Sequence, residues 1–221
     1  MRLVLPRLYV ILDAALITSS ERDCALSLAE AGVRLLQYRN KLATSRQFLK
    51  FSRELAEALG PHGVTFFVND RPDVAFLAGA SGVHVGQEDL DVEQARQVAG
   101  QNKLVGISTH NLEQFQRAAA SSADYIAVGP IFGTSSKANP DPVVGLDFLR
   151  KVRPLSDKPV VAIGGISPER AAAVIEAGAD SVAVISGILS AADPGQRARQ
   201  YIETLESAKH AGGGPRNLPN G

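Results

Sequence analysis

Two kinds of hydrophobic pattern alternate along the chain. Short apolar runs rich in β-branched residues predict buried strands, and longer stretches of helical period predict amphipathic helices. The expected strands are residues 8–12, 34–39, 65–69, 82–85, 104–108, 125–129, 159–164 and 181–186. The expected helices are residues 20–32, 44–60, 71–80, 91–100, 111–122, 145–152, 167–179 and 194–208. A strand is therefore followed by a helix eight times.

This order of elements predicts the fold class. Strands that are apolar on both faces and connected by helices are typical of a parallel sheet. Eight such units predict an α/β protein with a (β/α)8 TIM barrel in a single domain, residues 1–208. An open doubly wound sheet is the alternative arrangement of the same elements. Residues 209–221 are rich in Gly and Pro without periodicity, so we expect a disordered C-terminal tail.

Composition narrows the possible partners. Of the 221 residues 45% are hydrophobic and 21% charged, which is ordinary for a globular protein. The 23 Lys and Arg balance the 23 Asp and Glu, so no net charge attracts nucleic acid or an anionic membrane. The single Cys24 cannot form an internal disulfide, and no run reaches the roughly 20 apolar residues of a membrane helix. We expect a cytoplasmic protein that binds neither nucleic acid nor a membrane, and the composition leaves the choice between a monomer and a homo-oligomer open.

Polar side chains gather where the expected strands end. In a barrel of this kind the carboxyl ends of the strands surround one shared mouth, where chemistry occurs. The second strand runs into "QYRNK", the third into "NDR" and the fourth into "GQED". Asn and Asp at such ends also serve as turn or helix N-cap residues. Turns and caps do not explain why Arg39, Lys41 and Lys137 would lie at the same edge of the barrel. The pattern therefore favours an active or binding site.

Asp70 and Asp89 follow consecutive strands and predict a metal site. Two neighbouring carboxylates repel each other unless a cation lies between them or one of them is protonated. Magnesium prefers oxygen ligands and keeps positions for water and substrate phosphate. A phosphorylated substrate would also explain the basic residues nearby. Surface ion pairs are the alternative reading of these charges.

A second phosphate site is expected after the last two strands. The motifs "IGGIS" and "VISG" place Gly164, Gly165, Ile185 and Ser186 there. Barrels often bind phosphate at this position through backbone N–H groups, although a tight turn would also explain the paired glycines. Two phosphate regions in one mouth indicate two phosphorylated substrates, or one substrate phosphorylated at both ends.

The motifs together resemble a known family. From "LYVILD" to "VISGIL" the chain is similar to thiamine phosphate synthases, through "QYRNK", "NDR", "GVHVGQEDL", "GISTH", "GPIFGTSSK", "AIGGI" and "VISG". The resemblance implies a (β/α)8 barrel and a magnesium-dependent transferase. Its substrates would be a pyrimidine methyl diphosphate and a thiazole ethyl phosphate or the carboxylated form of the latter. Diphosphate would leave, a pyrimidine methylene cation would form, and the thiazole nitrogen would capture it.

The resemblance also implies roles for individual residues. The residues expected to hold the pyrimidine diphosphate are Gln37, Tyr38, Arg39, Asn40, Lys41, Asn69, Ser108 and Lys137. Of these, Arg39, Lys41, Ser108 and Lys137 would be catalytic, while Asp70 and Asp89 would bind magnesium. The residues expected at the thiazole phosphate are Thr134, Ser135, Ser136, Gly164, Gly165, Ile185 and Ser186. Asn40 departs from an acid that is frequent in the family, and Ser136 departs from a frequent Thr.

Two rival functions are weighed against this hypothesis. A thiazole tautomerase of the same superfamily needs a base near the thiazole, and its His would fall where this chain has Pro130. A non-catalytic sensor of a thiamine precursor should lose the metal-binding acids, which this chain keeps. The histidines favour neither rival, because His84 is expected to pack in the barrel and His110 to lie at a helix cap or the rim.

Overall fold

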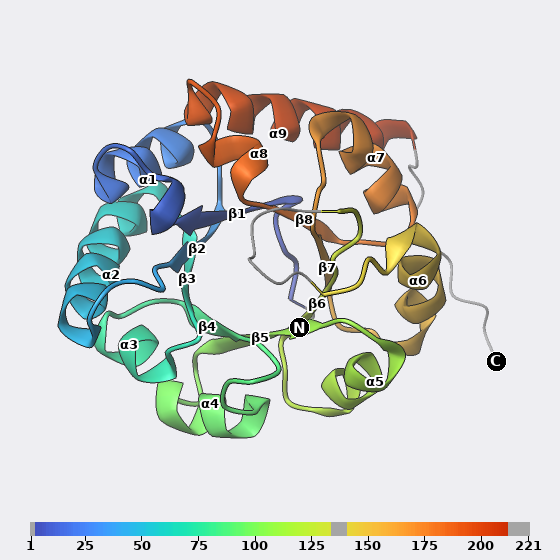
Figure 1. The fold of residues 1–221 in the computed structure, drawn as a ribbon, viewed down its shortest axis with the longest axis horizontal. Helices are drawn as coiled ribbons and strands as arrows, with labels where there is room; N and C mark the ends of the chain where they lie inside the picture. Colours follow the sequence, from blue (N-terminus) through green and yellow to red (C-terminus); the bar gives the residue numbers. More distant parts are fainter. Residues whose placement is uncertain (1–2, 134–140, 212–221) are drawn as a thin grey trace.

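The strands close into a parallel barrel. The computed structural model describes residues 3–133 and 141–211 (Figure 1). Each strand pairs with the next, and β8 pairs with β1 to complete the barrel. The strands are β1 (Leu8–Asp13), β2 (Leu35–Arg39), β3 (Thr65–Asn69), β4 (Gly82–Val85), β5 (Leu104–Thr109), β6 (Tyr125–Val128), β7 (Val160–Ile163) and β8 (Ser181–Val184). The predicted TIM barrel is confirmed, and the open sheet is excluded.

A ring of helices surrounds the strands (Figure 1). They are α1 (Glu21–Glu30), α2 (Ser45–Leu59), α3 (Pro72–Leu77), α4 (Val92–Ala99), α5 (Leu112–Ala120), α6 (Gly145–Val152), α7 (Pro168–Glu176), α8 (Ser186–Leu189) and α9 (Pro194–Ala211). Short 3-10 helices are η1 (Ala14–Leu16), η2 (Gly60–His62) and η3 (Arg153–Leu155). The short helix α8 is additional to the eight helices that the hydrophobic pattern predicts. Helix α9 extends to Ala211, three residues beyond the expected barrel boundary, and the rest of the expected tail lies outside the described residues.

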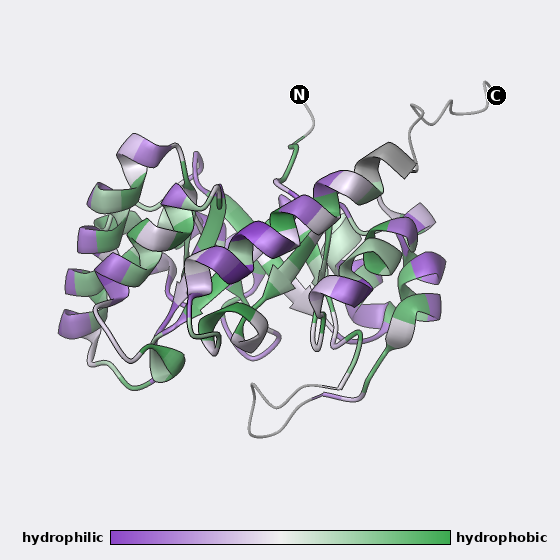
Figure 2. Ribbon diagram, turned by 90° about the horizontal axis from the view of Figure 1, so that it is seen from above, coloured by the Kyte–Doolittle hydropathy of each residue, from purple (hydrophilic) through white to green (hydrophobic). Residues whose placement is uncertain are grey.

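Two hydrophobic cores hold the barrel together. The larger core lies between the strands and the helices, whose apolar sides face inward and whose polar sides face outward (Figure 2). A smaller core fills the barrel interior and includes Tyr9, Phe67 and Tyr125. Gly106 makes room for one of these rings, because a Cβ there would lie 2.0 Å from Cζ of Tyr125. Aromatic rings thus close the barrel below the mouth.

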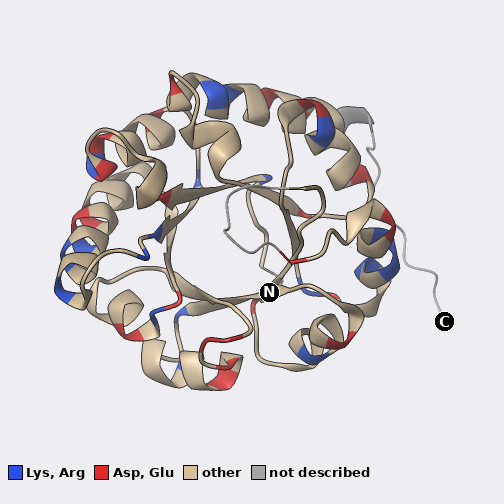
Figure 3. Ribbon diagram, in the orientation of Figure 1, with Lys and Arg blue, Asp and Glu red and all other residues tan. Residues whose placement is uncertain are grey.

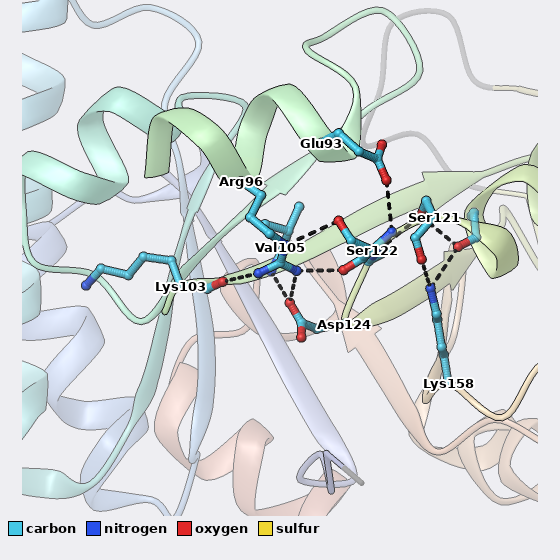
Figure 4. A network of polar contacts seen from close by, with 10 residues as sticks. Glu93, Arg96, Lys103, Val105, Ser121, Ser122, Asp124 and Lys158 are labelled. Atoms are coloured by element: carbon cyan, nitrogen blue, oxygen red, sulfur yellow. Dashed lines mark hydrogen bonds and ion pairs between the residues drawn. The ribbon is translucent and has the colours of Figure 1, made fainter. Parts of the chain in front are cut away.

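A polar network fastens the amino-terminal end of the barrel, opposite the mouth (Figure 4). Arg96 on α4 donates to the Lys103 carbonyl at 2.8 Å, to the Ser122 carbonyl at 2.6 Å and to Asp124 Oδ2 at 2.6 Å. The same Asp124 oxygen accepts from the Val105 amide at 2.7 Å. This end of such barrels commonly serves stability, and the network joins α4 to the starts of β5 and β6.

Charges of both signs are interspersed over the outer helices (Figure 3). None of the helices in the described ranges combines the length and apolar composition that a membrane span requires.

Candidate active site

A cavity of about 880 Å³ opens at the carboxyl ends of the strands. Eleven of the residues expected at the site line it: Gln37, Arg39, Lys41, Asn69, Asp70, Asp89, Ser108, Gly164, Gly165, Ile185 and Ser186. The cavity is large enough for ligands of ordinary metabolite size. Four further expected residues, Thr134, Ser135, Ser136 and Lys137, lie outside the described residues.

The two-residue period of β2 decides which of its side chains reach the cavity. Gln37 and Arg39 face the barrel interior, whereas Tyr38 between them faces the helices and is fully buried. The Tyr38 hydroxyl donates to Glu21 at 2.9 Å and accepts from the Asn40 amide at 3.0 Å. Asn40 Oδ1 also accepts from the backbone of Leu42 at 3.1 Å. The expectation that Tyr38 and Asn40 contact substrate is therefore corrected: neither lines the cavity, and Asn40 shapes the loop that carries Lys41.

Carboxylates already pair with the basic residues at the mouth. Arg39 forms an ion pair with Asp13, which is buried at the end of β1. Asp13 Oδ1 also accepts from the Ala15 amide at 3.1 Å, so the carboxylate is fixed from two sides. Lys41 pairs with Asp70. Sequence reasoning missed Asp13, although "LYVILD" ends in an acid just as acids follow β3 and β4.

The backbone at Asp70 is unusual. Its φ is +61°, and it is the only non-glycine residue in the described ranges with a positive φ. The Arg71 amide donates to the Asn69 carbonyl at 2.8 Å, which closes a γ-turn centred on Asp70. The cap of α3 is Arg71, with no side-chain cap bond, so Asn69 and Asp70 are not the helix cap considered above. Such strain costs roughly 1–3 kcal/mol and concentrates at functional sites.

Asp70 and Asp89 approach each other across the ends of β3 and β4. Loss of solvent around the Asp89 carboxylate raises its pKa, the bond from the Gly86 amide opposes this, and the neighbouring Asp70 raises the pKa further. The Gly86 amide donates to Asp89 Oδ2 at 2.7 Å. No group of three or more His, Cys, Asp and Glu within the described ranges could hold a metal ion. Two converging carboxylates nevertheless fit magnesium, which takes one or two protein carboxylates and completes its shell with water and phosphate.

A chain of polar side chains, all buried except Ser108, crosses the cavity floor. Gln37 Nε2 donates to the Tyr9 hydroxyl at 2.8 Å, and the Tyr9 and Tyr125 hydroxyls lie 3.0 Å apart. His84 bridges Tyr125 and Ser108, with Nδ1 2.7 Å from the Tyr125 hydroxyl and Nε2 2.8 Å from Ser108 Oγ. His84 is packed in the barrel as expected. The two tyrosines were missed, because only the closed barrel brings β1 and β6 together.

Two glycines with positive φ border the side of the cavity that follows β7. Gly164 and Gly165 have φ of +103° and +60°. A Cβ on Gly164 would lie 2.5 Å from Cβ of Pro130, and one on Gly165 would lie 2.3 Å from the Gly133 carbonyl. The paired glycines are thus required by the backbone and by close packing, and they still border the cavity. Arg197 and Tyr201, both from α9, line this side and were not singled out from the sequence.

His110 lines the cavity near the start of α5. Its Nδ1 donates to the Gly129 carbonyl at 2.6 Å, and its Nε2 lies 3.5 Å from Asp141. The residue after Gly129 is Pro130, so the described part of this loop carries no base at the position where a tautomerase would need one. Of the two positions expected for His110, the helix cap is taken by Asn111, and His110 lies at the cavity.

Comparison with known proteins gives a consistent result. A family model described as thiamine monophosphate synthase matches residues 8–188. A thiamine-phosphate synthase from Koribacter versatilis is 53% identical over 210 residues, which cover 93% of this chain and 98% of the relative. One from Chloroflexus aurantiacus is 44% identical and covers 88% of this chain and 90% of the relative. A solved thiamine phosphate pyrophosphorylase from Pyrococcus furiosus superposes with a TM-score of 0.83 at 33% identity, covering 91% of this chain and 96% of that chain.

Proposed function

Because the chain belongs to the thiamine monophosphate synthase family, we propose that it is a thiamine-phosphate synthase. The enzyme would transfer a pyrimidine methyl group from diphosphate to the nitrogen of a thiazole phosphate, with or without a carboxylate on the thiazole. The carboxylated form would also release CO2. The observation that carries the proposal is the cavity at the carboxyl ends of the strands, which has charged groups along β2 to β4 and a glycine-bordered side at β7 and β8.

The charged side suits a departing diphosphate. Arg39 presents a planar fork that is held in place by buried Asp13. Lys41 pairs with Asp70 and is half exposed, so it can exchange this partner for a phosphate oxygen. Asn69 and Ser108 add uncharged polar groups to the cavity lining. These groups act on negative charge that grows as the leaving group departs, so they would stabilise the transition state more than the bound substrate.

In the proposed reaction one bond breaks before another forms. The bond between the pyrimidine methylene carbon and the diphosphate oxygen breaks, and its electron pair leaves with diphosphate. The thiazole nitrogen then donates its lone pair to the methylene carbon. Neither step removes a proton from the thiazole, which agrees with the absence of a base at Pro130.

Asp70 and Asp89 would hold magnesium in this scheme, beside Lys41. When bound, magnesium would neutralise charge on the diphosphate oxygens. The Gly86 amide fixes the Asp89 carboxylate, and the γ-turn at Asp70 directs the second carboxylate to the same point. The distal phosphate of the thiazole would lie against Gly165 and Ser186, with Arg197 as a neighbouring cation.

Omission of substrates one at a time tests the function. Purified chain is incubated with magnesium and both substrates, or with either alone, and thiamine phosphate and diphosphate are quantified. The proposal predicts equal amounts of both products, and neither product when one substrate is missing. Isomerisation of a thiazole phosphate without any diphosphate release would indicate the tautomerase. Binding of a precursor without either reaction would indicate the sensor.

Isotope scrambling tests the order of the two bond changes. Pyrimidine diphosphate carrying ¹⁸O in the bridging position is incubated with enzyme and magnesium in the absence of thiazole. Departure before attack predicts that the label spreads into non-bridging positions when the pair recombines. A label that stays in place, in an enzyme with normal turnover, would indicate that the nitrogen attacks as diphosphate leaves.

A further inference from the structure

The buried chain from Gln37 to Ser108 joins two sides of the cavity through the barrel interior. Its members come from five strands: Gln37 from β2, Tyr9 from β1, Tyr125 from β6, His84 from β4 and Ser108 from β5. Tyr9 and Tyr125 are 1% and 0% exposed. Burial raises the pKa of both tyrosines well above the ordinary value, so both remain hydroxyls. Each hydroxyl therefore has one proton to donate.

The amide of Gln37 sets the direction of donation. An amide nitrogen can only donate, so the Tyr9 oxygen accepts from Gln37 Nε2. Among the described residues Tyr9 has one other hydrogen-bond partner, Tyr125, and its proton must point there. Tyr125 then has its own proton left for His84 Nδ1. The reverse direction would leave the Tyr9 proton buried without an acceptor, which is costly.

The same direction fixes the tautomer of His84. Because Nδ1 accepts from Tyr125, it carries no proton, and the ring proton lies on Nε2, where it donates to Ser108 Oγ at 2.8 Å. The Ser108 oxygen is then an acceptor within the chain, and its proton is left for a group in the cavity. A His beside a Ser resembles a base beside a nucleophile, yet this His has no lone pair facing the Ser.

We propose that Tyr9, Tyr125 and His84 are positioning residues that orient the Ser108 hydroxyl as a hydrogen-bond donor to an oxygen of the departing diphosphate. This inference rests on the proposed function for the identity of the ligand. Ser108 acts as a donor and neither attacks the substrate nor loses its proton. The chain would also hold Gln37 and Ser108 at a fixed separation, so that both ends of the pyrimidine substrate meet a rigid wall.

The tautomer can be measured without any substrate. In protein with ¹⁵N-labelled histidine, NMR correlations within the ring of His84 show which nitrogen carries the proton. We expect the proton on Nε2 in the wild type. In Tyr125→Phe, Nδ1 loses its donor and the other tautomer becomes populated. The matched control is Tyr201→Phe, which removes a hydroxyl that donates to the Ile166 carbonyl at 2.9 Å, outside the chain. It should leave the His84 tautomer unchanged.

Binding of inorganic diphosphate tests whether the chain acts through Ser108. Calorimetry with magnesium present gives the Kd for wild type, Tyr125→Phe, Ser108→Ala and the double variant. Loss of one hydrogen bond to a charged group should weaken binding by about tenfold in each single variant. The double variant should bind no worse than Ser108→Ala, because in this proposal Tyr125 acts on the ligand through Ser108. If Tyr125 had only a structural role, the weakening of binding in the double variant would be the product of the weakenings in the two single variants.

The outcomes separate this inference from the proposed function. A proton on Nδ1 of His84 in the wild type would overturn the inference even if thiamine phosphate is formed. Multiplying losses in the double variant would overturn it as well. An Nε2 proton together with non-additive losses would support it, and because neither measurement uses turnover, this holds even if the chain makes no thiamine phosphate.

Discussion

Replacement of Asp70 separates its role in the backbone from its role in the site. A γ-turn with a φ of +61° is easy for Gly and costs Ala about 1 kcal/mol or more. The Lys41 side chain is 57% exposed, so loss of its ion pair with Asp70 costs at most about 1 kcal/mol. Relief of the repulsion between Asp70 and Asp89 offsets part of this cost. We therefore expect Asp70→Gly to lie within about 1 kcal/mol of wild type, and Asp70→Ala to be about 1 kcal/mol less stable than Asp70→Gly.

Thermal unfolding without magnesium measures this difference. In a chain of this size 1 kcal/mol corresponds to about 2–4 °C, so the Ala variant should melt about 2–4 °C below the Gly variant. Both variants should lose magnesium-dependent turnover. Normal turnover in Asp70→Gly would refute the metal assignment. An Asp70→Gly variant that fails to fold would show that the carboxylate is mainly structural.

Three further predictions concern other parts of the molecule. Arg96→Ala removes the centre of the amino-terminal network, in which the Arg96 and Asp124 side chains are 14% and 27% exposed. The free energy of unfolding, measured by denaturant titration, should fall by about 2–3 kcal/mol. Turnover per folded molecule should stay unchanged. Its control, Arg117→Ala, removes a surface pair with Glu113 and should cost under about 0.5 kcal/mol; equal losses would contradict the argument. Burial raises the pKa of all four tyrosines, that of Tyr201 to about 12, so tyrosinate should form only as the chain unfolds in alkali. Because Tyr in the unfolded chain ionises near a pKa of about 10, the contribution of the buried hydroxyls to the stability of the fold is complete below about pH 10 and is lost as pH rises through the folded pKa. Tyrosinate absorbance near about pH 10 in a chain with native circular dichroism would disprove this prediction. Finally, Lys137→Ala should lower kcat by about 10² if Lys137 stabilises the leaving group, whereas Ser186→Ala should mainly raise the KM for the thiazole phosphate; normal kcat in Lys137→Ala at saturating pyrimidine diphosphate would limit that residue to binding.

The sequence predicts the barrel well because each strand and helix has its own periodic signal. It also predicts Asp70, Asp89 and Arg39, since the carboxyl ends of parallel strands must meet at one mouth. The position of Tyr38 was assigned wrongly from a motif, although the alternation of side chains along β2 points it away from Gln37. Tyr9 and Tyr125 look like ordinary core residues in the sequence, because their hydroxyls meet across 116 positions only after the barrel closes.

In the proposed arrangement, one cavity holds the diphosphate on the side of Arg39, Asp70 and Asp89 and the single phosphate on the side of Gly165 and Ser186. A crystal structure of the chain with thiamine phosphate, diphosphate and magnesium tests this arrangement most directly. We expect diphosphate and metal beside the two carboxylates, and the phosphate of the product against the two glycines. Diphosphate bound at Gly165, or product bound outside the cavity, would contradict it.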